Sequence, residues 1–140
     1  MVTKRVKTTS EVGLRKGFRS GLEDAIAKQL REAGVKVEYE AFKIPYTRPA
    51  RDCKYTPDWR LPNGIIIESK GRFDIDDRQK HVFIRDQHPE YDIRFVFSNP
   101  NTRISKISPT TYAMWCEKNG FKYAKQRIPE AWLKEPLKRR

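Results

Sequence analysis

The chain is organised around Tyr55-Thr56-Pro57-Asp58-Trp59-Arg60-Leu61-Pro62-Asn63-Gly64-Ile65-Ile66-Ile67-Glu68-Ser69-Lys70-Gly71. The Asn-Gly pair in this stretch lies between two short apolar runs, which predicts a β-hairpin. Side chains alternate along a strand, so Glu68 and Lys70 point the same way, and the chain reversal brings Asp58 back beside them. The stretch therefore predicts two carboxylates and one ammonium group that meet next to a buried strand.

Two carboxylates in such a place repel each other unless a cation lies between them. Their oxygens suit a hard cation such as Mg²⁺ or Mn²⁺, and Lys70 is placed to hold a phosphate oxygen or to orient a water molecule. The arrangement of Pro57-Asp58, a gap, and then Glu68-Ser69-Lys70 resembles the motif of metal-dependent nucleases with a restriction-endonuclease-like core. The motif is short and arises often by chance, but its place on a hairpin in a basic chain makes it more specific.

The composition indicates one domain with a modest core and a wide polar surface. The 140 residues are 37% hydrophobic and 34% charged, with a mean hydropathy of −0.84. The net charge of +12 favours a polyanion as partner. We expect nucleic acid rather than an anionic membrane, since the sequence contains no long basic amphipathic helix. Charge that serves solubility alone is the remaining alternative.

The two cysteines, Cys53 and Cys116, form no C-x-x-C pair. No signal peptide is recognisable, and no apolar run is long enough to span a membrane. These features predict reduced thiols in a cytoplasmic protein that has no membrane partner.

The first 34 residues predict an arm followed by a helix. Residues 1–17 are polar and basic without a period, and we expect a flexible arm that orders on nucleic acid. A helix then opens at Ser20 and closes at Gly34, with apolar residues at helical spacing. Glu23 has two interpretations, a capping box with Ser20 or a metal ligand in the first turn, and spacing alone favours the cap.

The next segment predicts a strand and a long connection. Val35 to Phe42 alternates, which is typical of a half-buried strand with Glu38 and Glu40 facing solvent. Lys43 to Lys54 contains two prolines and is long for a hairpin loop, so we expect an extended connector or an edge strand. This connector either follows phosphates with its cations or carries the chain across to a partner subunit.

The rest of the chain alternates between helices and strands. We expect a helix from Asp74 to His88-Pro89, a strand over 92–98, a helix capped by Ser108 with Pro109 in its first turn, a short strand over 121–123 and a helical turn over 128–132. The order of elements predicts an α/β fold, a mixed β-sheet flanked by helices. Four aromatic side chains suit core packing better than stacking on bases: Tyr112, Trp115, Tyr123 and Trp132.

Seven strings of the sequence resemble the phage endonuclease I family, in register from about Gly13 to Pro136. They are Phe18-Arg19-Ser20-Gly21-Leu22-Glu23-Asp24, Glu38-Tyr39-Glu40, Tyr55-Thr56-Pro57-Asp58, Leu61-Pro62-Asn63-Gly64-Ile65, Glu68-Ser69-Lys70-Gly71, Arg85-Asp86-Gln87-His88-Pro89-Glu90 and Ile128-Pro129-Glu130-Ala131-Trp132. The resemblance implies a structure-selective endodeoxyribonuclease that resolves four-way (Holliday) and other branched DNA junctions, and the host-cell cytoplasm as its location.

The resemblance also implies a restriction-endonuclease-like fold and a homodimer that exchanges segments. The nuclease domain would span 18–136, with residues 43–53 as an extended bridge to the partner and 137–140 as a short basic tail. Each active site would be composite, with Glu23 from one subunit and Asp58, Glu68 and Lys70 from the other. The resemblance therefore favours Glu23 as a metal ligand over Glu23 as a helix cap. Glu38 matches a family position tied to activity.

The implied chemistry is phosphodiester hydrolysis with two divalent ions, Mg²⁺ or Mn²⁺, in each active site. Asp58 would bridge both ions, Glu68 and the backbone carbonyl of Ser69 would complete one site, and the partner's Glu23 would complete the other. Lys70 would orient the attacking water, and the products would carry 5′-phosphates.

Phosphate contacts are expected from the arm, the bridge and the second helix, which implies weak sequence preference and a steep dependence on salt. The candidate DNA-binding residues are Arg15, Lys16, Arg19, Arg48, Arg51, Arg72, Arg78, His81 and Arg85. A lone histidine on a helix is more often structural than functional. The alternatives are a nuclease for ordinary duplex DNA, a junction-binding protein that does not cut, and a basic partner of an acidic protein.

Overall fold

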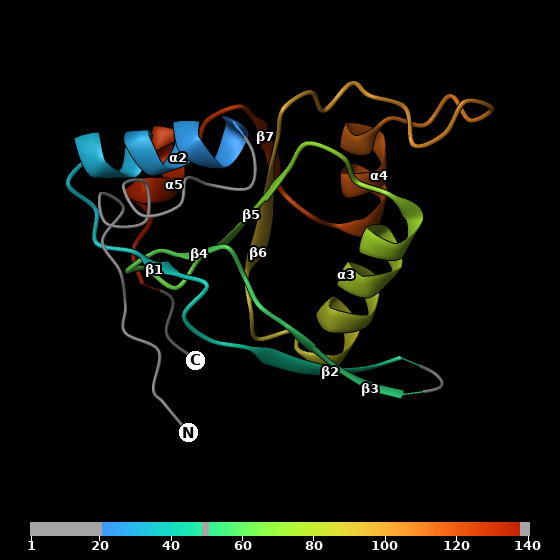
Figure 1. The fold of residues 1–140 in the computed structure, drawn as a ribbon, viewed down its shortest axis with the longest axis horizontal. Helices are drawn as coiled ribbons and strands as arrows, with labels where there is room; N and C mark the ends of the chain where they lie inside the picture. The colour runs from blue at the N-terminus through green and yellow to red at the C-terminus, as the bar shows by residue number, and fades with distance from the viewer. Residues whose placement is uncertain (1–20, 49–50, 138–140) are drawn as a thin grey trace.

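A computed structural model describes residues 21–48 and 51–137 of the chain. A five-stranded mixed sheet has the order β1-β4-β5-β6-β7. Its strands are β1 (Glu38–Tyr39), β4 (Trp59–Arg60), β5 (Ile66–Lys70), β6 (Ile93–Phe97) and β7 (Tyr123–Lys125). Helices α2 (Gly21–Glu32) and α5 (Glu130–Leu133) cover one face, and α3 (Ile75–Gln87) and α4 (Tyr112–Asn119) cover the other (Figure 1). The predicted α/β fold, a mixed sheet flanked by helices, is confirmed.

Alternation along the central strands divides the core between the two faces. Ile67 and Val96 pack with the apolar side of α2, whereas Ile66, Phe95 and Phe97 pack with α3 and α4. Because β5 and β6 are buried on both faces, both are largely apolar, apart from Arg94 in β6 and the polar carboxyl end of β5. That end is where Glu68 and Lys70 lie.

The predicted hairpin is the antiparallel pair β4–β5, with Trp59 opposite Ile67. Its turn is closed by the Gly64 N–H, which donates to the Leu61 carbonyl at 2.9 Å, and Gly64 takes a φ of 91°. Glycine adopts this left-handed conformation without steric cost, so the Asn-Gly signal located the reversal correctly. β5, β6 and β7 then run parallel, with α3 and α4 as their crossovers.

The predicted end of α2 and the predicted start of α3 are confirmed, whereas the predicted start of α4 is wrong. Gly34 (φ 67°) closes α2, and Asp74 caps α3 by accepting from the Asp77 N–H. The expected Ser108 cap is wrong, because α4 begins at Tyr112 and Thr111 is its cap. The preceding chain is extended instead, since the Ile104 N–H donates to the Thr110 carbonyl and Thr111 bridges to Arg103. Ser20 lies outside the described residues.

The strand expected over Val35–Phe42 shrinks to the two residues of β1. Val37 and Tyr39 are buried as alternation predicts. The alternation then stops at Glu40, whose φ is 47°, and this backbone turn ends the strand. Glu38 faces solvent as expected, but the expectation that Glu40 does so is wrong, because a carboxylate oxygen of Glu40 lies within 4.8 Å of those of Glu23 and Asp58.

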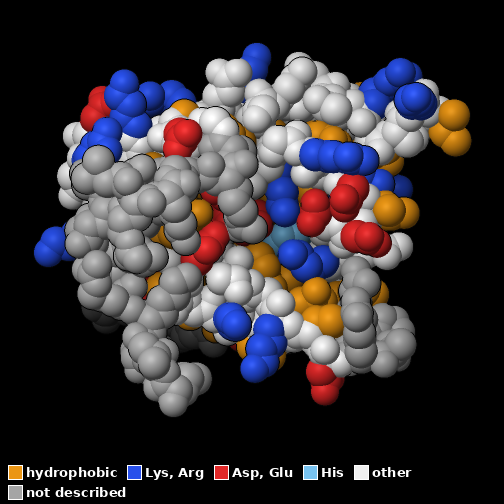
Figure 2. Space-filling view, viewed as in Figure 1, with side chains coloured by type: hydrophobic (Ala, Val, Ile, Leu, Met, Phe, Trp, Pro, Cys, Tyr) orange, Lys and Arg blue, Asp and Glu red, His pale blue; other side chains and the backbone are white. Residues whose placement is uncertain are grey.

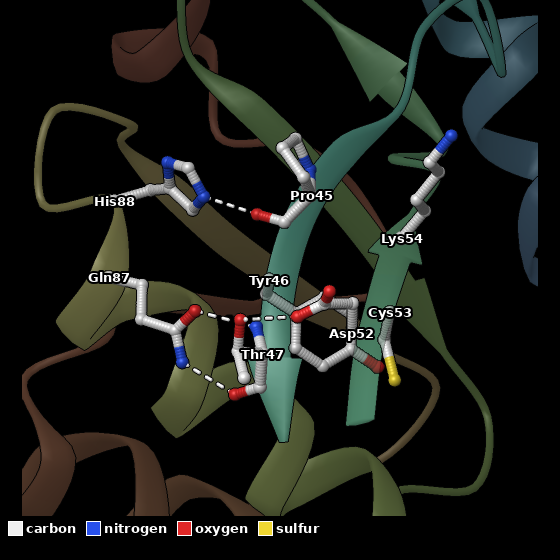
Figure 3. A pocket seen from close by; sticks show the side chains of 8 residues that line it. All are labelled: Pro45, Tyr46, Thr47, Asp52, Cys53, Lys54, Gln87 and His88. Atoms are coloured by element: carbon white, nitrogen blue, oxygen red, sulfur yellow. Dashed lines mark hydrogen bonds between the residues drawn. The ribbon is translucent and has the colours of Figure 1, made fainter. Parts of the chain in front are cut away.

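The long connection folds back on itself rather than running as a single extended segment. Its strands β2 (Ile44–Arg48) and β3 (Arg51–Tyr55) pair antiparallel, with Ile44 opposite Tyr55. The end of α3 holds β2 in place (Figure 3): the Thr47 N–H donates to Gln87 Oε1 at 2.6 Å, Gln87 Nε2 donates to the Thr47 carbonyl at 2.7 Å, and a ring nitrogen of His88 lies against the Pro45 carbonyl. Within one chain, the segment predicted to be a bridge is therefore a docked hairpin.

Of the four aromatic side chains predicted to pack in the core, Tyr112 is buried in it, and Trp115, Tyr123 and Trp132 pack against it while partly buried. Trp115 stacks on Phe121 with ring centroids 5.5 Å apart, and Tyr112 is buried. The predicted arm (1–17) lies outside the described residues, as does the predicted tail beyond Leu137. Among the helices that the structure describes, none is long and apolar enough to cross a membrane.

Candidate active site

The carboxyl end of β5 carries Glu68 and Lys70 on the face that α3 covers. Glu68 is 5% exposed, and its Oε1 accepts from the Tyr55 hydroxyl at 2.6 Å. Its Oε2 lies 3.5 Å from Lys70 Nζ, which also lies 3.3 Å from Asp77 Oδ1 in the first turn of α3. A strand and a helix N-terminus thus hold the lysine between two acids.

Asp58 approaches the same strand from the start of the hairpin. It is 3% exposed, and its Oδ2 accepts from the Ser69 N–H at 3.0 Å and from the Ser69 hydroxyl at 2.9 Å. The Asp58 N–H in turn points at Glu68 Oε1, 3.4 Å away. The predicted meeting of Asp58, Glu68 and Lys70 is therefore present in the folded chain, with Ser69 orienting one carboxylate.

A second acidic group lies on the other side of Asp58. One carboxylate oxygen each from Glu23, Glu40 and Asp58 lie within 4.8 Å of one another. Glu23 comes from the first turn of α2, is 4% exposed, and accepts from the Tyr39 hydroxyl at 3.2 Å. Glu23 and Asp58 therefore meet here within a single chain.

Burial and mutual repulsion determine how these groups hold protons. Desolvation, followed by the charge of Asp58, raises the pKa of Glu68 to about 8, although Lys70 and Tyr55 act in the opposite direction. Burial lowers the pKa of Lys70, but the attraction of Glu68 and Asp77 outweighs it and the net shift is upward. The site thus has a firmly protonated lysine and a carboxyl group that holds its proton unless further positive charge arrives.

The donor set fits a divalent cation. Oxygen ligands lie about 2.0–2.6 Å from Mg²⁺ or Ca²⁺, so ligands on opposite sides of one ion are about 4–5 Å apart. The carboxylate oxygens of Glu23, Glu40 and Asp58 lie no farther apart than 4.8 Å, which is within this limit. A cation would also offset the repulsion that raises the pKa of Glu68.

Sequence reasoning missed three contributors to this site, namely Glu40, Tyr55 and Asp77. Alternation along a regular strand predicts a solvent-facing Glu40, and no local pattern in the sequence marks Tyr55 or Asp77 as part of the site. Glu38, by contrast, is not brought into the group: its side chain is 42% exposed and lies 3.8 Å from Arg60. Its role in activity stays a prediction.

The candidate DNA-binding residues fall in different environments. Arg72 is exposed directly after β5, whereas Arg78 is buried and donates to the Phe73 carbonyl at 2.6 Å. Arg85 donates to the Asn119 carbonyl and pairs with Asp86. The predicted phosphate contact of His81 is not possible in this structure, because its ring is fully buried between aromatic side chains and burial keeps its pKa well below the usual value.

The remaining basic candidates are not placed by the described structure. Arg48 and Arg51 lie in β2 and β3, and only their backbones are described. Arg15, Lys16 and Arg19 lie outside the described residues. The face drawn in Figure 2 shows acidic and basic side chains gathered around a hollow rather than one continuous basic surface.

Comparison with known proteins agrees with this geometry. The family model for phage endonuclease I matches residues 1–140. The chain is 56% identical over 128 residues to "Endonuclease I" of Escherichia phage T7, covering 90% of this chain and 86% of that protein. It is 55% identical over 123 residues to "Endodeoxyribonuclease 1" of Enterobacteria phage T3, covering 88% and 81%. This chain therefore belongs to the phage endonuclease I family.

Proposed function

We propose that this protein is a structure-selective endodeoxyribonuclease that cuts four-way and other branched DNA junctions by metal-dependent hydrolysis and leaves 5′-phosphate ends. The observation that carries the proposal is the convergence of buried Asp58 and Glu68 with Lys70, in a chain of this family. The net charge of +12 supports a nucleic-acid substrate. A pure binding protein has no need of a buried acidic group that costs stability.

We infer two divalent ions, Mg²⁺ or Mn²⁺, in each site. Asp58 lies between the two groups of oxygens and would contribute to both ions, with Glu68 and the Ser69 carbonyl on one side and Glu23 on the other. When bound, such ions lower the pKa of a coordinated water and offset charge on the phosphorus.

The protein's own residues position the reactants. Tyr55 and Ser69 fix the carboxylates of Glu68 and Asp58, so these need little rearrangement on binding. Lys70 keeps its positive charge between Glu68 and Asp77 and is placed to orient the water or to hold a phosphate oxygen. Exposed Arg72, which follows directly, would contact a flanking phosphate.

We further propose that the active form is a homodimer that exchanges segments between chains, with residues 43–53 as the bridge. The described chain supplies a route: α2 and β1 connect to the rest of the domain only through the β2–β3 hairpin. If that hairpin opens, Glu23 of one chain meets Asp58 of the other in the contacts seen here within one chain. Light scattering should then give the mass of a dimer, and a monomer at micromolar concentration would contradict this part of the proposal.

The composite site has a sharper test in mixed dimers. Chains with Glu23→Gln and chains with Asp58→Asn are each expected to be inactive, but co-refolded mixtures would contain dimers with one intact site. Random assembly leaves about a quarter of the sites intact, and these should nick junctions. A mixture as inactive as either variant alone would show that both residues act from the same chain.

The activity itself is tested with an end-labelled four-way junction beside a linear duplex of the same arms, in Mg²⁺. We expect cuts near the branch point and an intact duplex. Equal cutting of both substrates would mark a general duplex nuclease. Tight junction binding without cuts in Mg²⁺ or Mn²⁺ would mark a binding protein.

A further inference from the structure

We propose that Glu40 is a further metal-binding residue, which supplies a third carboxylate to the cation position between Glu23 and Asp58. This inference rests on the proposed metal-dependent function and adds a residue to it. It begins from a departure from the sequence pattern, because alternation along β1 puts Glu40 on the solvent side.

The backbone turns Glu40 toward the site. Its φ of 47° is uncommon for a residue with a side chain, and it ends β1 directly after Tyr39. The Glu40 N–H donates to the Asp58 carbonyl at 3.0 Å, which ties Glu40 to the backbone of the central ligand, directly before β4. The Glu40 side chain, which is only partly buried, thereby joins the two nearly buried carboxylates.

The positions of the oxygens suit one ion. The three oxygens lie within 4.8 Å of one another, which is the separation expected of ligands around a single hard cation. The Tyr39 hydroxyl donates to Glu23 and so limits the orientations of that carboxylate. Lys70, the lysine of the Glu68-Ser69-Lys70 motif, lies between the carboxylates of Glu68 and Asp77.

Charge balance gives Glu40 a distinct role. Glu23, Asp58 and Glu68 alone carry less negative charge than two divalent ions carry positive charge. With Glu40 as a fourth carboxylate the charge of the two ions is neutralised, while Lys70 is paired with Asp77. We therefore expect Glu40 to determine how tightly the ion next to Glu23 is held.

The test measures ion binding in the absence of DNA, so that catalysis does not enter. Manganese binding to the full chain is followed by titration calorimetry for the wild type, for Glu40→Gln and for Glu32→Gln. Glu32 is exposed at the end of α2, so its variant loses the same charge away from the site. We expect Glu40→Gln to lose one bound ion or to bind its weaker ion at least about tenfold less tightly, and Glu32→Gln to match the wild type.

A second measurement separates a ligand from a structural residue. Without metal, in EDTA, Glu40→Gln should melt at or above the wild-type temperature, because one of three neighbouring carboxylates is gone. On addition of Mn²⁺ it should gain less stability than the wild type. Glu40→Asp, which keeps the charge on a shorter side chain, should bind Mn²⁺ more tightly than Glu40→Gln does.

Two outcomes would contradict the role of Glu40, and a third would also contradict the proposed metal-dependent function. Equal Mn²⁺ binding by wild type and Glu40→Gln would overturn the role of Glu40 alone. A Glu40→Gln protein that melts well below wild type in EDTA, with an unchanged gain from Mn²⁺, would also overturn it and leave a structural residue. Absence of Mn²⁺ binding by the wild type would overturn the metal-dependent function on which the inference rests.

Discussion

Two buried charged groups lie on neighbouring strands, and they differ in how their charge is balanced. Arg94 on β6 is fully buried, yet it donates two bonds to Asp92 and two to Glu135, with N–O distances of 2.5–2.9 Å, and it stacks over Trp132. Glu68 on β5 is almost as buried, but its charge is less well balanced. The neighbouring Asp58 carries the same negative charge, and Lys70, the cation beside Glu68, also pairs with Asp77.

The pKa shifts show the same contrast. Although burial acts to lower the pKa of Arg94, the hydrogen bonds that it donates to Glu135 and Asp92 raise that pKa, and the bond from Arg94 lowers the pKa of Glu135. Glu68 shifts toward its neutral form instead. A buried charge that is fully paired within the protein, such as Arg94, stabilises the fold. A buried charge that lacks a full counter-charge is typical of a functional site, where a bound ligand supplies the missing charge.

The largest effect should follow from removing the central ligand. Asp58→Asn keeps the shape and an acceptor for Ser69 but loses the charge, so we expect junction cleavage to fall by about 10³-fold or more. Single-turnover cleavage of a four-way junction in Mg²⁺ measures this. Melting in EDTA should be unchanged or raised, since repulsion is relieved. Cleavage within tenfold of wild type would remove Asp58 from the catalytic group.

The next effect is a dependence of metal-free stability on pH. Above about pH 4.5 the unfolded chain loses the Glu68 proton, whereas the folded protein keeps it up to about pH 8. The folded state thus binds more protons, and the free energy of unfolding should fall by on the order of 3 kcal/mol as pH rises from 5 to 8.

Urea unfolding in EDTA at several pH values measures this slope, and Glu68→Gln should flatten it. Saturating Mn²⁺ should reverse it, because ligation requires the deprotonated carboxylate. An equal slope in wild type and Glu68→Gln would assign the dependence to other groups.

Removing Arg94 from its ion pairs with Asp92 and Glu135 should lower the free energy of unfolding without lowering the rate of cleavage by the folded protein. Arg94→Met removes the buried cation and leaves Asp92 and Glu135 partly exposed, so they regain water and the expected loss is about 2 kcal/mol. Lys134→Met is the matched control, because Lys134 and Glu130 form an exposed pair that contributes less than about 1 kcal/mol. If both variants unfold at the same urea concentration, Arg94 does not stabilise the fold as described.

The smallest effect concerns the surface beside the site. Arg72→Ala should weaken junction binding only a few-fold and lower the slope of log affinity against log salt by about 1. Gel-shift titrations at several salt concentrations, in Ca²⁺ to prevent cutting, measure this. Lys118→Ala on α4 removes the same charge and should leave both quantities nearly unchanged; equal effects of the two variants would mean that Arg72 acts only through net charge.

The functional centre was largely predictable because its signals are local. Alternation fixed Glu68 and Lys70 on one side of β5, and Asn63-Gly64 located the reversal that returns Asp58. Gly34 and Asp74 marked helix ends through backbone preferences of single residues. The resemblance then brought Glu23 into the group, which its spacing as a cap had not favoured.

What the sequence by itself determined, then, is the β4–β5 hairpin with the strand β6 that follows it, the paired carboxylates with their lysine, and the family. Only the tertiary structure decided that Glu40 turns inward, that His81 is buried, that β2 pairs with β3 beside α3, and that Arg94 is balanced by Asp92 and Glu135. The physical reason is the distance along the chain over which each interaction acts. Periodicity and turn preferences depend on adjacent residues, whereas burial and charge balance depend on segments that meet only after the chain has packed.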